Sequence, residues 1–337
     1  MVTVGIIGAG RIGRVHTQSI RTQVPEAVTK TIADPFMNEK TEAWAKENGI
    51  ANVTTNYKDI LNDPEIDAVL ICSSTDTHSP ISVEAIKAGK HVFCEKPIDH
   101  DITKIQEVIT ALNENPVKYQ VGFNRRFDHN FQAVKKAVDA GKIGEKHIIK
   151  ITSRDPEPPA PEYVKVSGGI FLDMTIHDFD MVRYLAGCDA TEVYVAAANL
   201  VDPAIGEAGD VDTAIITLEM EDGSLAVIDN SRKAVYGYDQ RAEVFGSKGM
   251  VSTGNDSATK AVIANEEGIT SEKPLYFFLE RYMDAYANEV KAFIHAIETD
   301  TDTPLGVDDG LKPVLMGLAA KKSLEEHRPV KISEILA

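Results

Sequence analysis

The segment Gly8-Ala9-Gly10-Arg11-Ile12-Gly13 constrains the fold of this chain most, because its G-x-G-x-x-G spacing occurs in a specific structural context. It ends the apolar run Val2–Gly8, which has the length and the continuous hydrophobicity of a strand buried on both faces. A helical pattern then extends from Arg11 to Ile20. The segment therefore predicts a strand–turn–helix unit whose helix N-terminus can hold an anion.

The alternation of strand and helix patterns continues over the first 120 residues. The further strand patterns are Ala27–Asp34, Asp67–Ser74 and His91–Pro97, and the helical ones are Glu39–Asn48 and Pro80–Ala88. Because parallel strands need crossover connections, this order predicts an α/β domain with a doubly wound parallel sheet and helices on both faces. We place this domain at residues 1–120.

From about Lys118 the pattern changes to longer, alternating strands. These are "HIIKITSR", "EVYVAAANLV", "TAIITLEM", "SLAVIDNS" and "AEVFGS". The turn signals Glu221-Asp222-Gly223 and Gly246-Ser247-Lys248-Gly249 predict hairpins between neighbouring strands. Helical patterns at Tyr282–Glu298 and Gly310–Glu326 close the chain. Residues 121–337 are expected to form an α+β domain on an open, largely antiparallel sheet, whose C-terminal helices can pack back on the first domain.

Composition narrows the class of protein. A chain of 337 residues can form two domains with separate cores, and a net charge of −17 without a basic stretch argues against nucleic-acid binding. Its three cysteines include no C-x-x-C pair, so Cys72 and Cys94 are expected to be buried, reduced thiols. The N-terminus opens directly into a strand, and no apolar run is long enough to span a bilayer. We expect a cytoplasmic enzyme.

The glycine spacing and one carboxylate predict a dinucleotide cofactor. Gly8 permits the tight turn, Gly10 lets the backbone approach a pyrophosphate, and Gly13 lets helix and strand pack closely. Asp34 ends the second strand 34 − 13 = 21 residues beyond the last glycine, where a carboxylate accepts hydrogen bonds from a ribose and repels a 2′-phosphate. No Lys or Arg directly follows Asp34, so NAD is favoured over NADP. The alternative is a glycine-rich turn without a ligand.

Residues at the carboxyl ends of the other strands are expected to line the same crevice. Lys96 ends the strand pattern "HVFCEKP", although a surface charge is an open alternative. His78 follows the third strand, where it could cap the helix as well as contact the cofactor. The predicted cofactor-binding residues are Gly8, Gly10, Arg11, Ile12, Gly13, Asp34, Ser74, Thr75, His78, Glu95 and Lys96.

The stretch "GGIFLDMTIHDFDM" (Gly168–Met181) predicts an apolar helix with one narrow polar strip. At about 100° per residue, Asp173, His177 and Asp180 fall within about 60° of one another. Asp178 lies about 140° from Asp173 and is expected to be a structural partner. Buried carboxylates are costly unless they are paired, so the strip must face partners or a cleft.

The strip is better suited to proton transfer than to metal binding. Asp173 and His177 at i, i+4 could ligate a divalent ion, but this helix face offers no Cys and no second His, so we expect no metal. Beside NAD, His177 can take the proton of a secondary alcohol, because an imidazole has an unperturbed pKa of about 6.5. Asp173 can orient the ring, and Lys96 can stabilise the developing alkoxide.

Together the motifs resemble a known family. G-x-G-x-x-G, "HVFCEKP", "GFNRRFD" (Gly122–Asp128) and "GGIFLDMTIHDFDM" occur in the order found in the glucose–fructose oxidoreductase and inositol dehydrogenase superfamily. "SRDP", "VYGYDQR" and "FFLERY" make the chain most similar to the NAD-dependent inositol 2-dehydrogenases within it. The resemblance implies a Rossmann domain, a C-terminal open-sheet domain and a homotetramer built through those sheets.

The resemblance also implies roles for individual residues. The catalytic group would be Lys96, Asp173 and His177, and the substrate-binding residues would be Lys96, Asn124, Arg126, Asp155, Asp173, His177, Tyr236 and Tyr282. From the residues alone, Arg126 could equally be a domain-interface charge and Tyr236 a packing residue. A set of hydroxyl-directed donors and acceptors suits a polyol better than a 2-hydroxy acid, which needs a carboxylate clamp.

These observations predict NAD-dependent oxidation of one ring hydroxyl of a cyclic polyol, myo-inositol, to the ketone. The segment between Ser153 and Ser167 varies in such folds, which leaves scyllo-inositol, D-chiro-inositol or a related sugar as alternatives. A non-catalytic dinucleotide sensor is a further alternative. Lys96, Asp173 and His177 argue against a sensor, because a protein that only binds NAD needs no base beside the nicotinamide.

Overall fold

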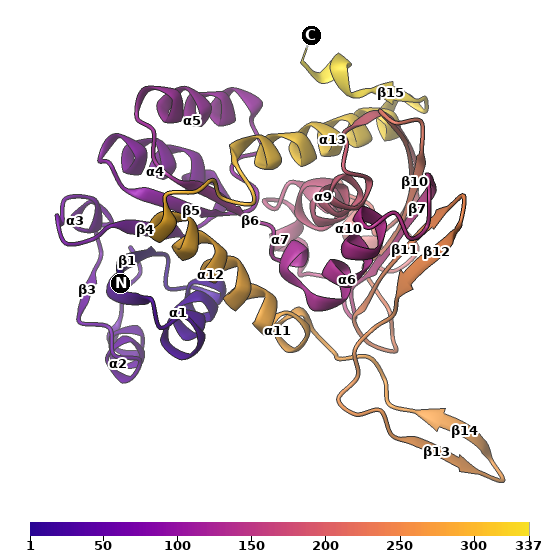
Figure 1. Ribbon diagram of the computed structural model, residues 1–337, viewed down its shortest axis with the longest axis horizontal. Coiled ribbons are helices and arrows are strands. Elements are labelled where there is room, and N and C mark those ends of the chain that lie inside the picture. The colour runs from indigo at the N-terminus through magenta and orange to yellow at the C-terminus, as the bar shows by residue number, and fades with distance from the viewer. Residues whose placement is uncertain (337) are drawn as a thin grey trace. The chain divides into compact units, whose positions relative to one another are not determined.

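The computed structural model describes residues 1–336, which form two compact units (Figure 1). The first unit comprises Met1–Phe127 and Met283–Leu311. The second comprises Asp128–Tyr282 and the residues from Lys312 onward. The second boundary lies within the long helix α13 (Val307–Glu326), so residues 283–311 belong to the first unit although they follow most of the second in sequence.

The first unit is built on a six-stranded sheet with the order β3-β2-β1-β4-β5-β6. Its strands, all paired in parallel, are β1 (Val2–Ile7), β2 (Ala27–Ala33), β3 (Asn52–Thr54), β4 (Ala68–Ile71), β5 (His91–Glu95) and β6 (Tyr119–Gly122). Its helices are α1 (Arg11–Gln23), α2 (Glu39–Glu47), α3 (Lys58–Leu61), α4 (Thr75–Lys87), α5 (Ile102–Glu114), η1 (Asn124–Phe127) and α12 (Met283–Thr299). This strand order is that of the Rossmann fold and confirms the predicted doubly wound sheet.

Continuous burial explains why the central strands of this sheet lack an alternating pattern. Ile6 on β1, Leu70 on β4 and Phe93 on β5 are fully buried, as expected for strands covered on both faces. Val290 and Phe293 of α12 belong to the same hydrophobic core. The apolar face of α12 therefore completes the first unit.

The helix α4 differs from its prediction. The sequence pattern predicted a start at Pro80, but the helix begins at Thr75 and contains Pro80. Pro80 is the sixth residue of α4 and has no N–H, so the helix lacks the bond that this position would make to the carbonyl of Asp76. The structure thus places Thr75 and His78 in the first turn of α4.

The second unit is built on a seven-stranded sheet with the order β12-β11-β7-β10-β9-β8-β15. Its strands are β7 (Lys146–Arg154), β8 (Ala190–Ala198), β9 (Thr213–Met220), β10 (Leu225–Ser231), β11 (Asp239–Gly246), β12 (Gly249–Thr253) and β15 (Val330–Lys331). Only β7 and β10 pair in parallel among the described strands of this sheet, and the predicted hairpins β9–β10 and β11–β12 are antiparallel. The prediction of a largely antiparallel open sheet is therefore confirmed.

The second unit contains further helices and a second, two-stranded sheet. They are α6 (His129–Asp139), α7 (Pro161–Val164), α8 (Gly169–Asp173), α9 (Thr175–Ala186), α10 (Pro203–Glu207), α11 (Phe278–Arg281), η2 (Ile332–Ile335) and the separate hairpin of β13 (Val262–Asn265) and β14 (Gly268–Ser271). The helices α6 and α9 contact the sheet, and residues alternate between buried and exposed along β9. Across residues 1–336, none of the helices has the length and hydrophobicity needed to cross a membrane.

The predicted single helix over 168–181 is divided in two. The segments α8 and α9 are separated by Met174, and the N–H of His177 bonds to the carbonyl of Met174, three residues earlier, at 3.3 Å. Beyond the break, Thr175 donates a hydrogen bond of 2.6 Å to Asn230 on β10. This buried bond fixes the start of α9 against the sheet, so Asp173 and His177 lie on different helical segments.

Candidate functional site

The turn between β1 and α1 is tightly packed at two of its three glycines. Gly8 has a φ of +106°, and a Cβ there would lie 2.6 Å from the carbonyl oxygen of Cys72. A Cβ on Gly13 would lie 1.9 Å from the carbonyl oxygen of Gly8. Both positions therefore require glycine, because any larger side chain would push α1 away from β1.

Gly10 differs from the other two glycines because the space beside it is open. A Cβ on Gly10 would meet nothing within 4 Å, and no side chain caps the helix α1 that begins at the next residue. An uncapped helix N-terminus presents N–H groups to an anion, and the missing Cβ leaves room for it. The turn thus fits the pyrophosphate of a dinucleotide.

Asp34 lies beside this turn. Its Oδ2 accepts a hydrogen bond of 2.7 Å from the N–H of Ala9, and its Oδ1 accepts one of 2.8 Å from the N–H of Phe36. These bonds fix the carboxylate at the end of β2, next to the glycine turn. The half-buried side chain has lone pairs left for the hydroxyls of a ribose.

The other predicted cofactor residues of the first unit follow neighbouring parallel strands. Ser74 precedes α4 and Thr75 begins it, just after β4, while Glu95 and Lys96 lie at the end of β5. Parallel pairing brings these strand ends to one edge of the sheet, the edge where β1 ends. Glu95 is buried, and its Oε1 lies 2.7 Å from Nε2 of His16 on α1.

Two predicted substrate residues also belong to the first unit. Asn124 and Arg126 lie in the short 3-10 helix η1, directly after β6. Asn124 is buried, and Arg126 donates a hydrogen bond of 3.1 Å from Nη2 to Asp309. The ion pair with Asp309 fixes the guanidinium at the carboxyl edge of the same sheet.

In the second unit, two donors hold the carboxylate of Asp173. Tyr163 donates from its hydroxyl to Oδ1 at 2.9 Å, and Arg232 donates from Nη1 to Oδ2 at 3.2 Å. The same Nη1 lies 3.7 Å from Oδ2 of Asp155. Asp155 and Asp173, which are 18 residues apart in sequence, therefore share one guanidinium.

Sequence reasoning missed Arg232. It follows β10 in "NSRK", which looks like a polar turn, and only the parallel register that pairs Ser231 with Arg154 brings it beside Asp155. Its side chain is buried, and Nε and Nη2 have no hydrogen-bond partner among residues 1–336. Buried donors normally have an acceptor, so Nε and Nη2 of Arg232 are an exception to the usual pairing of buried polar groups.

Asp210 adds a further carboxyl group near this cluster. A Cβ on Gly169 would lie 2.9 Å from its Oδ1, so the start of α8 packs directly on it. Burial raises the pKa of Asp210, and the nearby charge of Asp173 raises it further, although hydrogen bonds from the backbone of Ile170 and Val211 and the charge of Arg232 oppose the shift.

The other polar residues of α9 have different surroundings. Asp178 is fully buried and accepts a hydrogen bond of 2.9 Å from Nδ2 of Asn230, which confirms the predicted structural role. Asp180 is also buried, with Nη1 of Arg183 at 4.0 Å. His177 is half-buried, so among these residues it has the more accessible side chain.

The two predicted tyrosines occupy contrasting environments. The hydroxyl of Tyr236 donates to Asp239 at 2.6 Å and accepts from Arg154 at 3.2 Å, within a network of charged groups on β7 and β11. Tyr282 is 1% exposed and packs edge-to-face on Tyr238 at 5.9 Å. Tyr236, at 39% exposed, is thus the more accessible of the two.

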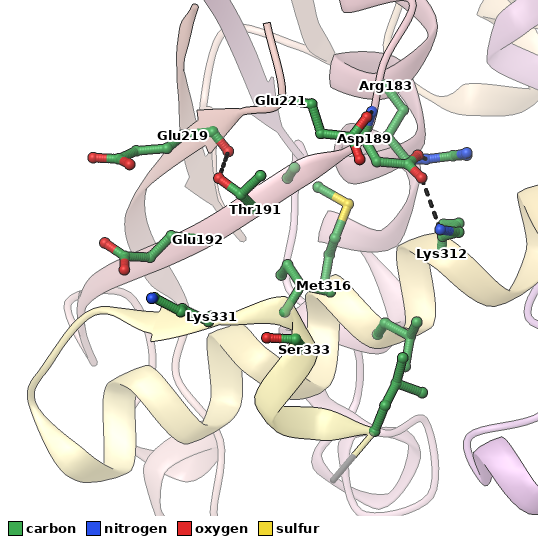
Figure 2. A pocket seen from close by; sticks show the side chains of 14 residues that line it. Arg183, Asp189, Thr191, Glu192, Glu219, Glu221, Lys312, Met316, Lys331 and Ser333 are labelled. Carbon is green, nitrogen blue, oxygen red and sulfur yellow. Dashed lines mark hydrogen bonds and ion pairs between the residues drawn. The ribbon is translucent and has the colours of Figure 1, made fainter. Parts of the chain in front are cut away.

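The second unit also has a separate pocket of about 550 Å³ at the β8 edge of its sheet (Figure 2). Figure 2 shows Lys312 and Arg183 gathered around Asp189, which accepts hydrogen bonds of 2.8 and 2.7 Å from them. Among the described residues, none of the predicted catalytic or substrate residues lines this pocket. Its paired charges stabilise the junction between α13 and the sheet.

Two family models match the chain, one in each of the two predicted domains. The model described as "Oxidoreductase family, NAD-binding Rossmann fold" matches residues 2–123. The model described as "GFO/IDH/MocA C-terminal domain" matches residues 131–252. The first match agrees with the glycine turn and Asp34 in assigning NAD as the cofactor.

Individual proteins resemble the chain over its whole length. A myo-inositol 2-dehydrogenase of Thermotoga maritima is 46% identical, and the match covers 99% of each chain. The structure of a myo-inositol dehydrogenase from Corynebacterium glutamicum superimposes with a TM-score of 0.93 at 37% identity over 98% of each chain. A scyllo-inositol dehydrogenase from Lactobacillus casei, solved with NAD(H) and scyllo-inositol, gives 0.92 at 32% identity over 99% of each chain.

The contrast between Gly10 and Gly13 predicts two different defects. Gly10→Ala should fold with an unchanged Tm, because φ is −69° and the space is open, but it should raise the Kd for NAD about tenfold. Gly13→Ala should lower the free energy of unfolding by about 3 kcal/mol, because its Cβ would overlap a backbone oxygen. Thermal unfolding and fluorescence titration with NADH measure both; a lowered Tm for Gly10→Ala would contradict the assignment.

The carboxylate of Asp34 predicts the choice of cofactor. Asp34→Ala should reduce the ratio of kcat/KM for NAD over NADP by roughly tenfold or more, because it removes a charge that repels the 2′-phosphate. Asp34→Asn is the matched control for the bond to Ala9, since it keeps an acceptor but loses the charge. Steady-state kinetics with both cofactors should show the change in both variants; an unaltered ratio in Asp34→Asn would assign discrimination to another residue.

Proposed function

Because the chain belongs to the GFO/IDH/MocA family of NAD-binding oxidoreductases, we propose that it oxidises one ring hydroxyl of myo-inositol to the ketone, 2-keto-inositol. The full-length identity of 46% to a myo-inositol 2-dehydrogenase supports this substrate. In this proposal the first unit binds NAD, and the second supplies Asp173 and His177.

The main structural support for this proposal is that Arg232 already faces two carboxylates. Its Nη1 already faces the carboxylates of Asp155 and Asp173, at 3.7 and 3.2 Å, so it is not available to clamp a substrate carboxylate. Its remaining buried donors suit uncharged hydroxyl oxygens, and the two carboxylates can accept from hydroxyl hydrogens. A neutral polyol satisfies both kinds of group, whereas a 2-hydroxy acid would add a third negative charge.

The proposed chemistry assigns one step to each of three side chains. NAD, when bound, supplies the acceptor for the hydride that leaves the carbinol carbon. His177 removes the hydroxyl proton, because a neutral imidazole is a competent base near neutral pH. Asp173, held by Tyr163 and Arg232, orients the imidazole, and the ammonium of Lys96 stabilises the negative charge that develops on the oxygen.

A second candidate substrate is scyllo-inositol or another stereoisomer. The likeness to the scyllo-inositol dehydrogenase from Lactobacillus casei, at a TM-score of 0.92, favours it. Stereoisomers of inositol differ in the direction of single hydroxyls, and a pocket rejects the wrong one only where a buried donor or acceptor is left unpaired. The side chains of Asp155 and Arg232 are therefore the ones expected to discriminate among them.

Turnover of a polyol panel tests this function. With NAD, myo-inositol should give the highest kcat/KM among myo-, scyllo- and D-chiro-inositol and common hexoses, measured as NADH formation. His177→Ala should lower kcat by roughly 10²–10⁴ with an unchanged Kd for NAD, since it removes the base. His129→Ala is the matched control, because that imidazole is 69% exposed in the same unit. No NADH with any polyol, or full turnover by His177→Ala, would contradict the proposal.

We further propose that the protein forms a homotetramer through the open face of the second unit's sheet. Met250, Phe245, Ile148 and Leu225 lie directly opposite one another on four neighbouring strands, so they share one face. Each of them is between 44% and 52% exposed. A row of four large apolar side chains in water is typical of a surface that another protein covers.

Self-association can be measured directly. Light scattering should give a mass four times the 36.7 kDa of one chain, and Phe245→Lys together with Leu225→Lys should reduce it, because buried lysines would be unpaired at the interface. Val28→Lys, at a 44% exposed strand residue of the first unit, is the control and should leave the mass unchanged. A monomeric wild-type protein would contradict the proposed assembly.

A further inference from the structure

Both ring nitrogens of His78 face backbone carbonyls. Nδ1 lies 2.8 Å from the carbonyl oxygen of Pro97, and Nε2 lies 3.0 Å from that of Ser73. The side chain is in the first turn of α4 and only 2% exposed. Both distances are those of ordinary N–H···O hydrogen bonds, so the ring has an acceptor at each nitrogen.

This geometry determines the charge of the ring. A carbonyl oxygen only accepts hydrogen bonds, and a neutral imidazole has a single N–H. A neutral His78 would therefore turn one nitrogen lone pair toward a carbonyl oxygen at hydrogen-bond distance, which is repulsive. The protonated imidazolium donates to both carbonyls, so it is the form that fits.

The surroundings agree with a charged ring. Burial alone lowers the pKa of His78, but Cys94 and the hydrogen bonds to Pro97 and Ser73 outweigh it and raise the pKa to about 9. The other titratable groups on adjacent segments are Asp76 on α4, Tyr119 on β6, Asp99 beyond Pro97, and Lys104 on α5, which pairs with Asp99. None of these four groups contributes to the shift in the pKa of His78, and Cys94 is the one titratable side chain that does.

The two carbonyls belong to the ends of neighbouring strands. Ser73 follows β4 and Pro97 follows β5, and these strands pair in parallel up to Ile71 and Cys94. Lys96 immediately precedes Pro97. His78 therefore ties together the two chain segments that follow the neighbouring strands β4 and β5 at the carboxyl edge of the sheet.

A second histidine holds the other neighbour of Lys96. His16, on the helix that follows the glycine turn, is fully buried, with Nε2 2.7 Å from Oε1 of Glu95. The buried carboxyl of Glu289 lies 4.0 Å from the same nitrogen, and burial together with the charge of Glu95 raises its pKa. Lys96 is thus flanked by two residues that buried imidazoles fix, Glu95 and Pro97.

We propose that His78 is a positioning residue, whose protonated ring fixes the ends of β4 and β5 and thereby the direction of the Lys96 side chain. It acts through Lys96 and does not touch the substrate. The inference rests on the proposed function of Lys96 in stabilising the alkoxide. It assigns His78 a role distinct from cofactor contact, because both nitrogens are engaged by the backbone.

The proposal has a defined pH dependence. The pKa is raised from 6.5 to about 9 in the folded protein, so the stabilisation is fully present below pH 6.5 and is lost as the pH rises through about 9. Above that pH one carbonyl loses its donor, and Lys96 loses part of its support. The kcat should therefore decline through about pH 9 while the Kd for NAD changes little.

Solid-state ¹⁵N NMR of histidine-labelled protein tests the charge without any substrate, with His78→Asn used to identify the signal. At pH 7.5 both nitrogens of His78 should show the chemical shifts of an imidazolium, and they should titrate near pH 9. One unprotonated nitrogen at pH 7.5 would overturn the proposal. This measurement does not depend on turnover, so it remains decisive if no polyol proves to be oxidised.

Kinetics of two variants tests the positioning role. Asn places its amide nitrogen near the position of Nδ1 and keeps the bond to Pro97, whereas Gln reaches the position of Nε2 and keeps the bond to Ser73. His78→Gln should lower kcat by roughly 10²-fold, the cost of a misplacement of about 1 Å, and His78→Asn should retain more activity. Neither variant should show the decline near pH 9.

The control lies at the opposite end of the same strand. His91 begins β5 and accepts a hydrogen bond of 3.0 Å from the N–H of Lys118, so His91→Asn also alters one backbone bond. It should leave kcat and its pH profile unchanged. If His78→Gln instead raises the Kd for NAD at constant kcat, His78 is a cofactor contact and the positioning role is wrong.

Discussion

The close packing of α1 on the end of β1 is the constraint on which the cofactor site depends. With a Cβ on Gly13 only 1.9 Å from a backbone oxygen, helix and strand touch directly and the helix start has one possible position. That position brings the N–H of Ala9 to Asp34 and the imidazole of His16 to Glu95. The contact between Gly8 and Gly13 thus aligns groups at the ends of β1, β2 and β5 with the start of α1.

The site residues of the second unit are organised by a charge rather than by close packing. Arg232 is buried, and it is compensated because Asp155 and Asp173 share its guanidinium. The ion pair with Asp173 fixes a carboxylate beside the start of α9, while Nε and Nη2 of Arg232 have no hydrogen-bond partner among residues 1–336. Removing this residue would leave two half-buried carboxylates without their shared counter-charge.

Predictions were most reliable where the interacting residues are close together in sequence. The glycine turn, the parallel order and the hairpins after Met220 and Gly246 depend on residues close in sequence, and all were recovered. The helix over 168–181 was predicted as continuous, because nothing local marks the break at Met174, beyond which Thr175 bonds to Asn230, 55 residues away. Pro80 was taken as a helix start, although the first turn begins five residues earlier.

The sequence by itself determined the doubly wound sheet, the glycine turn after its first strand, the choice of NAD as cofactor and the resemblance to polyol dehydrogenases. Each of these follows from local residue spacing or from hydrophobic periodicity, and both can be observed in the sequence itself. Only the tertiary structure decided that Arg232 joins Asp155 to Asp173 and that His78 joins Ser73 to Pro97. Strand register and helix packing bring those groups together, and no pattern of neighbouring residues records which distant backbone oxygen or carboxylate a buried cation will meet.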